Sequence, residues 1–363
     1  MIPRHYPYPT RTLLELFKEG ALDTVVSVEV EPEYGYATRI TYTDGGVRMT
    51  RGNDLGLNPS GACDVARDKA HTKFFLGSIG IRCPRGSSFV LPTWADQIGP
   101  WLLERGLAKI RGPSEALSYI QENIGYPNYV KPNEGSQGLD VHRCDSDADV
   151  TEAMVAMENR GVRVALIEEA VELPDFRIVV LDGVVISAYS REPLTVIGTG
   201  DASVGELLLQ KQASFKFEER DTRIPVGDER IDKRLKRLGL TRASTPGPGE
   251  RLCLLDQSNL SLGGEAEDLT KLIDVHWENL AVEISTSLGL RFCGVDLALG
   301  DVKSPDSEYS VLEVNSAPGL DHYAAVGLTQ EALVRALYAR LFCASPRKYD
   351  AGADHPVGGS KVA

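Results

Sequence analysis

Apolar residues recur at helix-like and strand-like intervals along most of the sequence. Near the N-terminus the pattern predicts a helix around Thr10–Lys18, followed by two strand-like stretches, VVSVEV and YATRITYT. Asp44-Gly45-Gly46 predicts a hairpin turn after the second stretch, because glycine tolerates positive φ. From Asp64 to Leu76 (DVARDKAHTKFFL) the apolar positions and two lysines fall near one helical face. This spacing predicts one helix across that segment.

The middle and C-terminal parts alternate between strands and helices. Strand-like segments are SFVLP, NYVK, VALIEEAV and FRIVVLDGVVISAY, the last with a turn predicted at Asp182-Gly183. Ser146 and Asp149 form a capping-box pattern that starts a helix over Asp147–Asn159. Further elements are predicted as an amphipathic helix in DERIDKRLKRLG, helices near 274–288 and 329–343, and strands at 293–299 and 309–314. This mixture lacks a strict βαβ rhythm, so it favours an α+β fold.

Composition narrows the class of protein. A length of 363 residues suffices for two or three packed units, and the formal net charge of −13 argues against a general binder of nucleic acid or anionic membranes. No apolar run approaches the ~20 residues that span a bilayer, and the N-terminus has no secretory apolar core. The six cysteines are scattered without a C-x-x-C pair, which predicts reduced core residues. We therefore expect a cytoplasmic enzyme with no nucleic-acid or membrane partner.

The sequence VKPNEGSQG (130–138) carries the first chemical signal. The common nucleotide motifs, G-x-x-x-x-G-K-[ST] and G-x-G-x-x-G after a strand, are absent. Here Lys131 ends a predicted strand and precedes Gly135, Ser136 and Gly138, within residues 133–138, which we call the glycine loop. Glycines let backbone N–H groups approach phosphate, the serine adds a hydroxyl donor, and the lysine adds a point charge. The alternative is a surface turn with an exposed lysine.

Two acidic stretches carry the remaining signals. In IEEAVELPDF (167–176), the backbone after Glu168 could pair with an adenine edge and Asp175 could accept ribose hydroxyls; ordinary surface acids are the alternative. In VLEVNSAPGL (311–320), Glu313 and Asn315 leave the same face of a predicted strand. With Asp296 on another strand they supply the oxygen ligands that Mg²⁺ prefers. The alternative is a buried pair satisfied by hydrogen bonds.

These motifs, in this order over about residues 60–340, resemble the ATP-grasp superfamily. The resemblance implies an α+β fold in which two α+β subdomains grip ATP, preceded by a small N-terminal α/β region. Lys69 in DKAHTK and Lys131 would bind phosphates. Glu168, Glu169 and Val171 would belong to the adenine hinge, and Asp175 would bind ribose. Two Mg²⁺ ions, for which Mn²⁺ could substitute, would be held by Asp296, Glu313 and Asn315.

Within the superfamily, three stretches are most similar to the ATP-grasp module of cyanophycin synthetases: FRIVVLDGVVISAYSREP, NLSLGG (259–264) and EVNSAPGL. Asn259, Ser261, Gly263 and Gly264 then look like a second anion-binding turn, with a plain hairpin as the alternative. Arg191 in SREP is the candidate for stabilising the transferred phosphoryl group, with a surface salt bridge as the alternative. Cyanophycin synthetases continue into a Mur-ligase-like half with its own P-loop, which this sequence lacks. We therefore expect a stand-alone amino-acid or peptide ligase.

The resemblance also sets the expected organisation and reaction. The expected domains are an N-terminal region (1–62), an ATP-grasp domain (63–345, divided at residue 170) and a disordered tail (346–363). The expected reaction is ATP-dependent amide formation between a small-molecule carboxylate and an amine, through an acyl phosphate, with release of ADP and phosphate. Two alternatives stay open: a phosphotransferase, or a non-catalytic nucleotide-binding subunit. A homodimer is a further expectation, because family members commonly form dimers.

Overall fold

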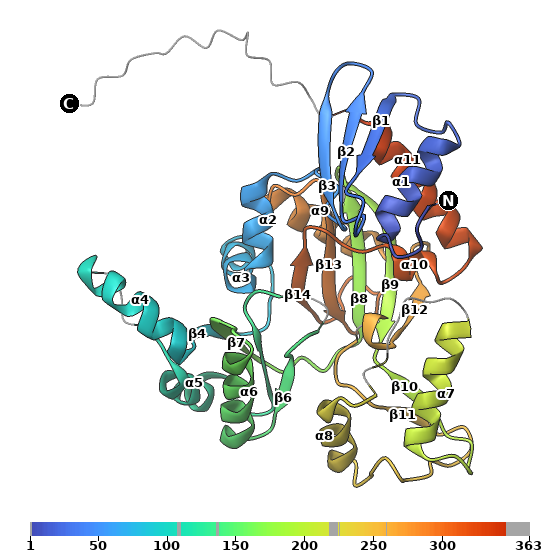
Figure 1. Cartoon of the computed structure of the whole chain (residues 1–363). Coiled ribbons are helices and arrows are strands. Elements are labelled where there is room, and N and C mark those ends of the chain that lie inside the picture. The colour runs from blue at the N-terminus through green and yellow to red at the C-terminus, as the bar shows by residue number, and fades with distance from the viewer. Residues whose placement is uncertain are drawn as a thin grey trace, which may run out of the picture. The chain divides into compact units, whose positions relative to one another are not determined.

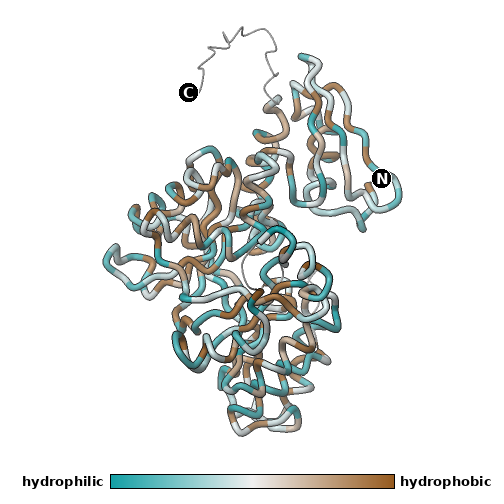
Figure 2. The backbone as a smooth tube through the Cα atoms, turned by 90° about the vertical axis from the view of Figure 1, so that its left-hand side faces the viewer, coloured by the Kyte–Doolittle hydropathy of each residue, from teal (hydrophilic) through white to brown (hydrophobic). Residues whose placement is uncertain are grey.

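The computed structural model describes residues 2–106, 110–135, 138–217, 224, 226–258 and 260–345. Its main chain divides into two compact units (Figure 1), one formed by residues up to Gly56 together with those from Leu328 onward, and one formed by Leu57–Gly327. Hydrophobic and hydrophilic stretches alternate over short distances along the backbone (Figure 2). Within the described ranges, every helix is too short or too polar to cross a membrane.

The first unit is a three-stranded antiparallel sheet with two helices that contact one another, α1 and α11. Its elements are α1 (Tyr8–Lys18), β1 (Val25–Val30), β2 (Ala37–Tyr42), β3 (Val47–Arg51) and α11 (Leu328–Cys343). The buried Arg48 of β3 donates to the carbonyl oxygens of Leu341, at 2.7 Å, and Ala344. Thr24 donates to the carbonyl of Cys343. The Arg48 guanidinium therefore lies at the C-terminal end of α11, where the helix dipole is negative.

The second unit contains a four-stranded antiparallel sheet in the order β4-β7-β5-β6. Its strands are β4 (Gly86–Val90), β5 (Asn128–Pro132), β6 (His142–Cys144) and β7 (Val164–Glu169), and its helices are α4 (Pro92–Glu104), α5 (Pro113–Tyr119), the π-helical turn Ile120–Ile124 and α6 (Asp147–Asn159). The Ser146 hydroxyl accepts from the Asp149 N–H, as the capping pattern predicts. Residues of β4, α5, β5, α6 and β7 share one apolar core.

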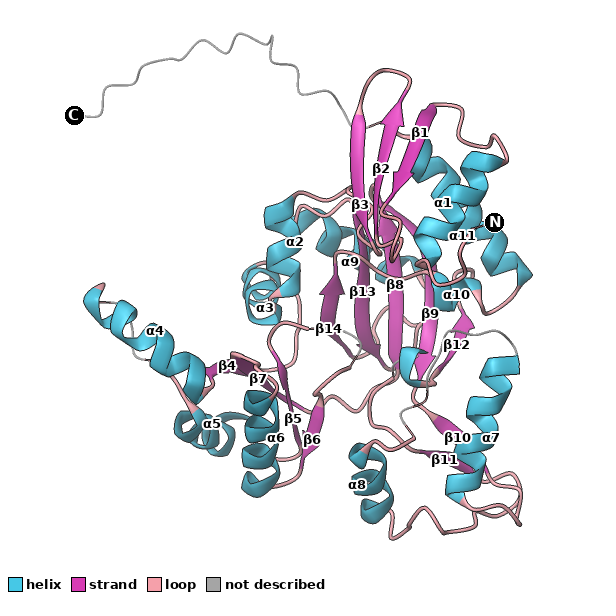
Figure 3. Cartoon of the chain, viewed as in Figure 1, coloured by secondary structure: helices cyan, strands magenta, loops and turns pink. Residues whose placement is uncertain are grey.

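A five-stranded sheet in the order β12-β9-β8-β13-β14 forms the centre of the second unit (Figure 3). Its strands are β8 (Asp175–Leu181), β9 (Val184–Glu192), β12 (Glu265–Asp268), β13 (Phe292–Leu299) and β14 (Tyr309–Asn315), accompanied by α2 (Ser60–Arg67), α3 (Lys69–Ser78), α9 (Val275–Ser287) and α10 (Asp321–Ala324). One face packs with α9, α2 and α3 around Trp277, which is fully buried. The other face carries charged side chains.

Residues between β9 and β12 form a separate small core. The elements are β10 (Thr195–Ile197), α7 (Val204–Phe217), α8 (Glu229–Arg237), β11 (Arg251–Cys253) and the 3-10 turn Leu260–Leu262. Leu208, Ile231 and Leu254 are among its fully buried members. We call residues 193–258 the α7/α8 insertion.

The α+β prediction is confirmed, and one predicted helix is wrong in detail. The segment from Asp64 to Leu76 lies in two helices, α2 and α3, that meet at Asp68. Asp68 has extended φ and ψ, and its carboxylate accepts the N–H of His71, so it ends one helix and caps the next. The predicted boundaries at residues 62 and 170 stay predictions, and the predicted tail 346–363 lies outside the described residues.

Candidate functional site

Strand register places a row of charged and polar side chains across one face of the five-stranded sheet. Glu313 of β14 is opposite Asp296 of β13, Asp296 is opposite Arg177 of β8, and Arg177 is opposite Tyr189 of β9. Directly opposite residues project from the same face of a sheet. The sequence predicts Asp296 and Glu313 as neighbours in one site, but it gives no such role to Arg177.

Asp296 is held by two arginines. Its carboxylate, 4% exposed, accepts from Arg177 Nε at 2.6 Å and Nη2 at 2.7 Å, and Arg191 Nη2 lies 2.9 Å from Oδ2. Burial alone would raise the pKa of Asp296, but Arg177 and Arg191 outweigh it and hold the pKa below its ordinary value. The arginines are thus fixed in place by a carboxylate that stays charged.

Arg191 joins this group to Asp175. It donates to Asp175 Oδ1 from Nη2 at 2.7 Å and from Nε at 3.1 Å. Burial raises the pKa of Asp175 to about 6, although Arg191 opposes the shift. The Asp175 carboxylate therefore already pairs with Arg191 on the sheet face. Its predicted contact with ribose stays a prediction.

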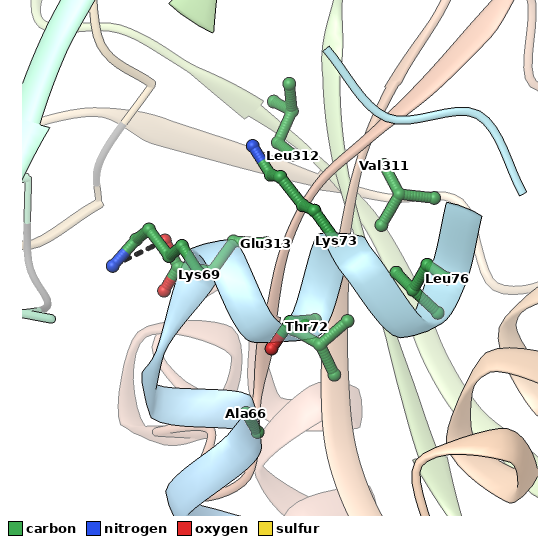
Figure 4. Close-up of a pocket in the computed structure, with 9 residues that line it drawn as sticks. Ala66, Lys69, Thr72, Lys73, Leu76, Val311, Leu312 and Glu313 are labelled. Carbon is green, nitrogen blue, oxygen red and sulfur yellow. Dashed lines mark ion pairs between the residues drawn. The ribbon is translucent and has the colours of Figure 1, made fainter. Parts of the chain in front are cut away.

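Lys69, the first residue of α3, contacts Gly135 of the glycine loop and Glu313 of β14. Its Nζ donates to the carbonyl of Gly135 at 3.0 Å and lies 3.8 Å from Glu313 Oε2. Figure 4 shows this ion pair, with Lys73 further along the same helix. Asn133 fastens the helix to the loop, since its backbone oxygen accepts from Lys69 N at 3.1 Å and its side chain accepts from Ala70 N at 3.0 Å. The structure thus brings together the predicted lysine, loop and carboxylate.

A second lysine pair surrounds Glu168, whose side chain is 3% exposed. Lys131 Nζ lies 2.6 Å from Glu168 Oε2, and Lys73 donates to the other oxygen. Burial, reinforced by Lys69, lowers the pKa of Lys131 to about 8, and burial together with Lys131 holds the pKa of Lys73 well below its ordinary value. Lys73 is absent from the predicted set. Its position four residues after Lys69, one helical turn on, is the signal that could have found it.

Backbone and side-chain groups of the predicted adenine hinge already form hydrogen bonds with other parts of the protein. β7 pairs with β4 on one side and β5 on the other, and the N–H of Glu169 donates to the carbonyl of Arg85 at 2.9 Å. The Glu169 carboxylate pairs with Arg85 Nε at 2.7 Å, and the N–H of Ala170 donates to Pro127. These contacts use the N–H groups of residues 169 and 170. The adenine contacts of Glu168, Glu169 and Val171 stay predictions.

Glycine conformation supports a loop at two of the predicted positions. Gly135 has φ +147° and Gly138 has φ +64°, values that other residues rarely adopt. At Gly263, with φ +98°, a Cβ would lie 2.9 Å from side-chain atoms of Leu194 and Ile224. Gly263 therefore closes the turn against the core of the α7/α8 insertion. Ser136 and Asn259 lie outside the described residues, and the anion-binding roles of Ser261 and Gly264 stay predictions.

A small hollow lies between α3 and β14. Its volume is about 200 Å³ including open solvent, and its polar lining comes from Lys69, Thr72, Lys73 and Glu313 (Figure 4). The hollow has essentially no enclosed space for even a water-sized molecule, whereas pockets that enclose a small molecule typically hold roughly 300–1,000 Å³. Both lysines of this lining already have protein partners, Gly135 and Glu313 for Lys69 and Glu168 for Lys73.

The predicted magnesium ligands fit the ion unequally. Among the described residues, no three His, Cys, Asp or Glu side chains are grouped closely enough to hold a metal. Glu313 supplies carboxylate oxygens whose nearest cation is Lys69, and Asn315 follows two residues later on β14. These two donors fit a hard cation. Both oxygens of Asp296 already accept from arginine, so this carboxylate fits a metal only when the arginines release it.

Comparisons with known proteins agree on one fold. Residues 256–333 match the RimK-like ATP-grasp domain. Cyanophycin synthetase from Crocosphaera subtropica is 30% identical over 292 residues, which is 77% of this chain and 31% of that protein. The glutathione biosynthesis bifunctional protein GshAB of Enterococcus faecalis is 30% identical over 228 residues, 58% of this chain and 30% of that protein. The chain thus spans about a third of the length of these curated relatives.

One solved structure supports the same fold. The bifunctional glutathione synthetase from Pasteurella multocida superimposes with a TM-score of 0.55 at 21% identity, covering 92% of this chain and 44% of that one. At this identity the likeness establishes the architecture alone.

Proposed function

We propose that this chain, which belongs to the ATP-grasp superfamily, is an ATP-dependent ligase that joins a carboxylate to an amine. The observation that carries the proposal is the arrangement of charges around Glu313. Lys69 lies 3.8 Å from Glu313, and Lys73 of the same helix pairs with Glu168, as does Lys131. Arg177 and Arg191 pair with Asp296, the residue opposite Glu313 on the sheet. One set of cations suits the phosphates of ATP, and the other suits a carboxylate or the transferred phosphoryl group.

The proposed reaction has two steps. A carboxylate oxygen attacks the γ-phosphorus of ATP and the bond to ADP breaks, which gives an acyl phosphate. An amine then attacks the acyl carbon, phosphate leaves with the bonding electrons, and the amine loses a proton. The first step needs charge neutralisation and in-line placement more than covalent help from a side chain.

Each group of residues has a role in this scheme. Lys69 and Lys131 bind phosphate oxygens, and the glycine loop supplies N–H donors. Arg177 and Arg191 neutralise the carboxylate and the moving phosphoryl group, because a guanidinium matches both in geometry. Glu313 and Asn315 would hold magnesium, with Asp296 joining after release from its arginines. Magnesium, when bound, neutralises charge on the β- and γ-phosphate oxygens.

Amino acids or peptides are the proposed substrates. The relatives carry names tied to cyanophycin and glutathione, both built from amino acids, and together these names support small acids and amines as partners. Holding both reactants in one site can supply an effective concentration on the order of 10⁵–10⁸ M.

The test is turnover with pooled substrates. The purified protein is incubated with Mg²⁺, ATP and pools of amino acids and short peptides, and phosphate release and new masses are followed. A ligase releases ADP and phosphate only when both an acid and an amine are present. Stable phosphorylated product without free phosphate would indicate a phosphotransferase instead. Tight ATP binding without turnover in any pool would refute the ligase proposal.

A further inference from the structure

Glu168 of β7 is a buried carboxylate shared by two lysines. Its side chain is 3% exposed, and its Oε2 lies 2.6 Å from Lys131 Nζ. Lys73 of α3 donates to the other oxygen, Oε1. The two lysine side chains are 12% and 13% exposed. One negative charge is therefore buried together with two positive charges, so this group of three carries one excess positive charge.

The strands on both sides of β7 accommodate this carboxylate. Tyr129 of β5 is directly opposite Glu168, and Lys131, two positions further along β5, reaches the carboxylate diagonally on the same face. The residue opposite Glu168 on β4 is Gly86. A Cβ at Gly86 would lie 2.6 Å from Glu168 Cγ, closer than such atoms approach, so the glycine leaves room for the glutamate side chain.

Lys73 reaches the same carboxylate from a helix. It follows Lys69 by one turn of α3, so the two lysines are neighbours on one helical face (Figure 4). Lys69 lies 3.8 Å from Glu313, whereas Lys73 pairs with Glu168. A buried carboxylate that loses its cation is strongly destabilised. Glu168 therefore needs at least one of its two lysines at all times.

We infer that Lys73 is a positioning residue that keeps Glu168 neutralised while Lys131 binds a phosphate of the nucleotide. Lys73 acts through the Glu168 carboxylate and does not touch the phosphate. An ammonium group is a compact point charge on a flexible stem, so Lys131 can turn from one oxygen to another. The phosphate then balances the excess positive charge of the group. This inference rests on the proposed nucleotide-binding function, and it gives the two lysines different roles.

The test compares ligands with and without phosphates. Lys73→Gln is titrated by calorimetry at pH 7 with Mg²⁺ and AMP-PNP, with Mg²⁺ and ADP, and with adenosine alone. Lys131 is then the remaining lysine of the group, so the phosphate must compete with Glu168 for it. We expect AMP-PNP and ADP to bind on the order of tenfold to a hundredfold more weakly, the range of a hydrogen bond to a charged group, with adenosine affinity unchanged. Lys73→Arg keeps a cation beside Glu168 and should bind all three ligands nearly like the wild type.

A second comparison removes the carboxylate charge first. Glu168→Gln leaves Lys73 no charge to neutralise, so adding Lys73→Gln should keep AMP-PNP affinity at the value that Glu168→Gln alone shows. This comparison does not require Lys73→Gln to fold by itself. Weaker AMP-PNP binding in the double variant than in Glu168→Gln would mean that Lys73 contacts the phosphate directly, which would overturn the inference.

Lys233→Gln is the matched control, because Lys233 belongs to another lysine–glutamate pair, with Glu152 of α6 at 2.9 Å. This variant should bind all three ligands like the wild type. Wild-type AMP-PNP affinity in Lys73→Gln would overturn the inference. An equal loss of adenosine and AMP-PNP affinity in Lys73→Gln would also overturn it, by reducing Lys73 to general packing. A wild-type protein that binds no AMP-PNP would refute the nucleotide function together with the inference.

Discussion

Replacing Arg177 by Met should test the charged row on the five-stranded sheet. Arg177, Arg191, Asp175 and Asp296 form a buried group with equal numbers of positive and negative charges. The substitution keeps much of the side-chain volume and removes one guanidinium. Asp296 then retains only its contact with Arg191, which it shares with Asp175. In the variant, the remaining buried side chains, Arg191, Asp175 and Asp296, would together carry one excess negative charge that water does not solvate.

The cost of protonating Asp296 sets an upper bound on the loss of folding free energy in Arg177→Met. Breaking a buried ion pair by removing one partner costs about 3–5 kcal/mol. The buried carboxyl can avoid part of this cost by taking up a proton. Its ordinary pKa of 3.8 lies about three units below pH 7, at about 1.4 kcal/mol per unit. Protonation therefore caps the penalty at roughly 4 kcal/mol at pH 7, and at roughly 2 kcal/mol at pH 5.

The direction of the Asp296 pKa shift determines how the stability penalty of Arg177→Met changes with pH. In the wild type the pKa of Asp296 is lowered, so its stabilising contribution is present above pH 3.8 and is lost as the pH falls through the lower folded value. In Arg177→Met the uncompensated burial raises that pKa. The variant should therefore be most destabilised at neutral pH, and the difference from wild type should shrink on acidification.

Urea unfolding with EDTA present, at pH 7 and pH 5, measures both free energies of unfolding. The double variant Arg177→Met/Asp296→Asn removes both charges and should recover part of the stability at pH 7. A penalty that is equal at the two pH values, or a double variant no more stable than Arg177→Met, would refute the reasoning.

Three further predictions concern other parts of the chain. AMP-PNP affinity should fall as the pH rises through about 8, because Lys131 is charged only below its lowered pKa; calorimetric titration from pH 6.5 to 9.5 checks this, and a flat profile would exclude Lys131 as a phosphate ligand. Arg48→Met should lower the free energy of unfolding by about 2 kcal/mol through lost hydrogen bonds to Leu341 and Ala344; an unchanged urea midpoint would count against it. Ser146→Ala should cost about 1 kcal/mol through the lost cap of α6, and Ser146→Asp should restore it, in the same assay.

Local signals in the sequence predicted the elements that depend on them. The cap at Ser146 and the turn at Asp182-Gly183 are both present. Each depends on a few adjacent residues, so the cap and the turn can be predicted from the local sequence. The break at Asp68 was missed because the apolar spacing continues across it, whereas the backbone there is decided by one capping carboxylate.

Sequence motifs identified some neighbours in the candidate site, but residues brought there only by the alignment of distant strands were missed. Lys69 lies 3.8 Å from Glu313, and Glu313 lies opposite Asp296, so the structure brings these residues together; their phosphate and metal roles stay predictions. Arg177 could not be assigned, because its partners depend on how β8 aligns with β13, more than a hundred residues later. Single charges inside apolar strands, such as Arg177 between Phe176 and Ile178, are the signal to follow in related sequences.

The contacts of Arg48 and Thr24 with the end of α11 have a consequence for biosynthesis. The strands of the first unit leave the ribosome early, but the helix they pack with is nearly three hundred residues further along. At roughly 5–20 residues per second, translation delays that helix by about 15–60 s. During this time the second unit, encoded between the two pieces, can complete its own sheets. The unit whose synthesis begins first is therefore the last that can be completed, and nascent chains stalled before Leu328 should expose its sheet to chaperones.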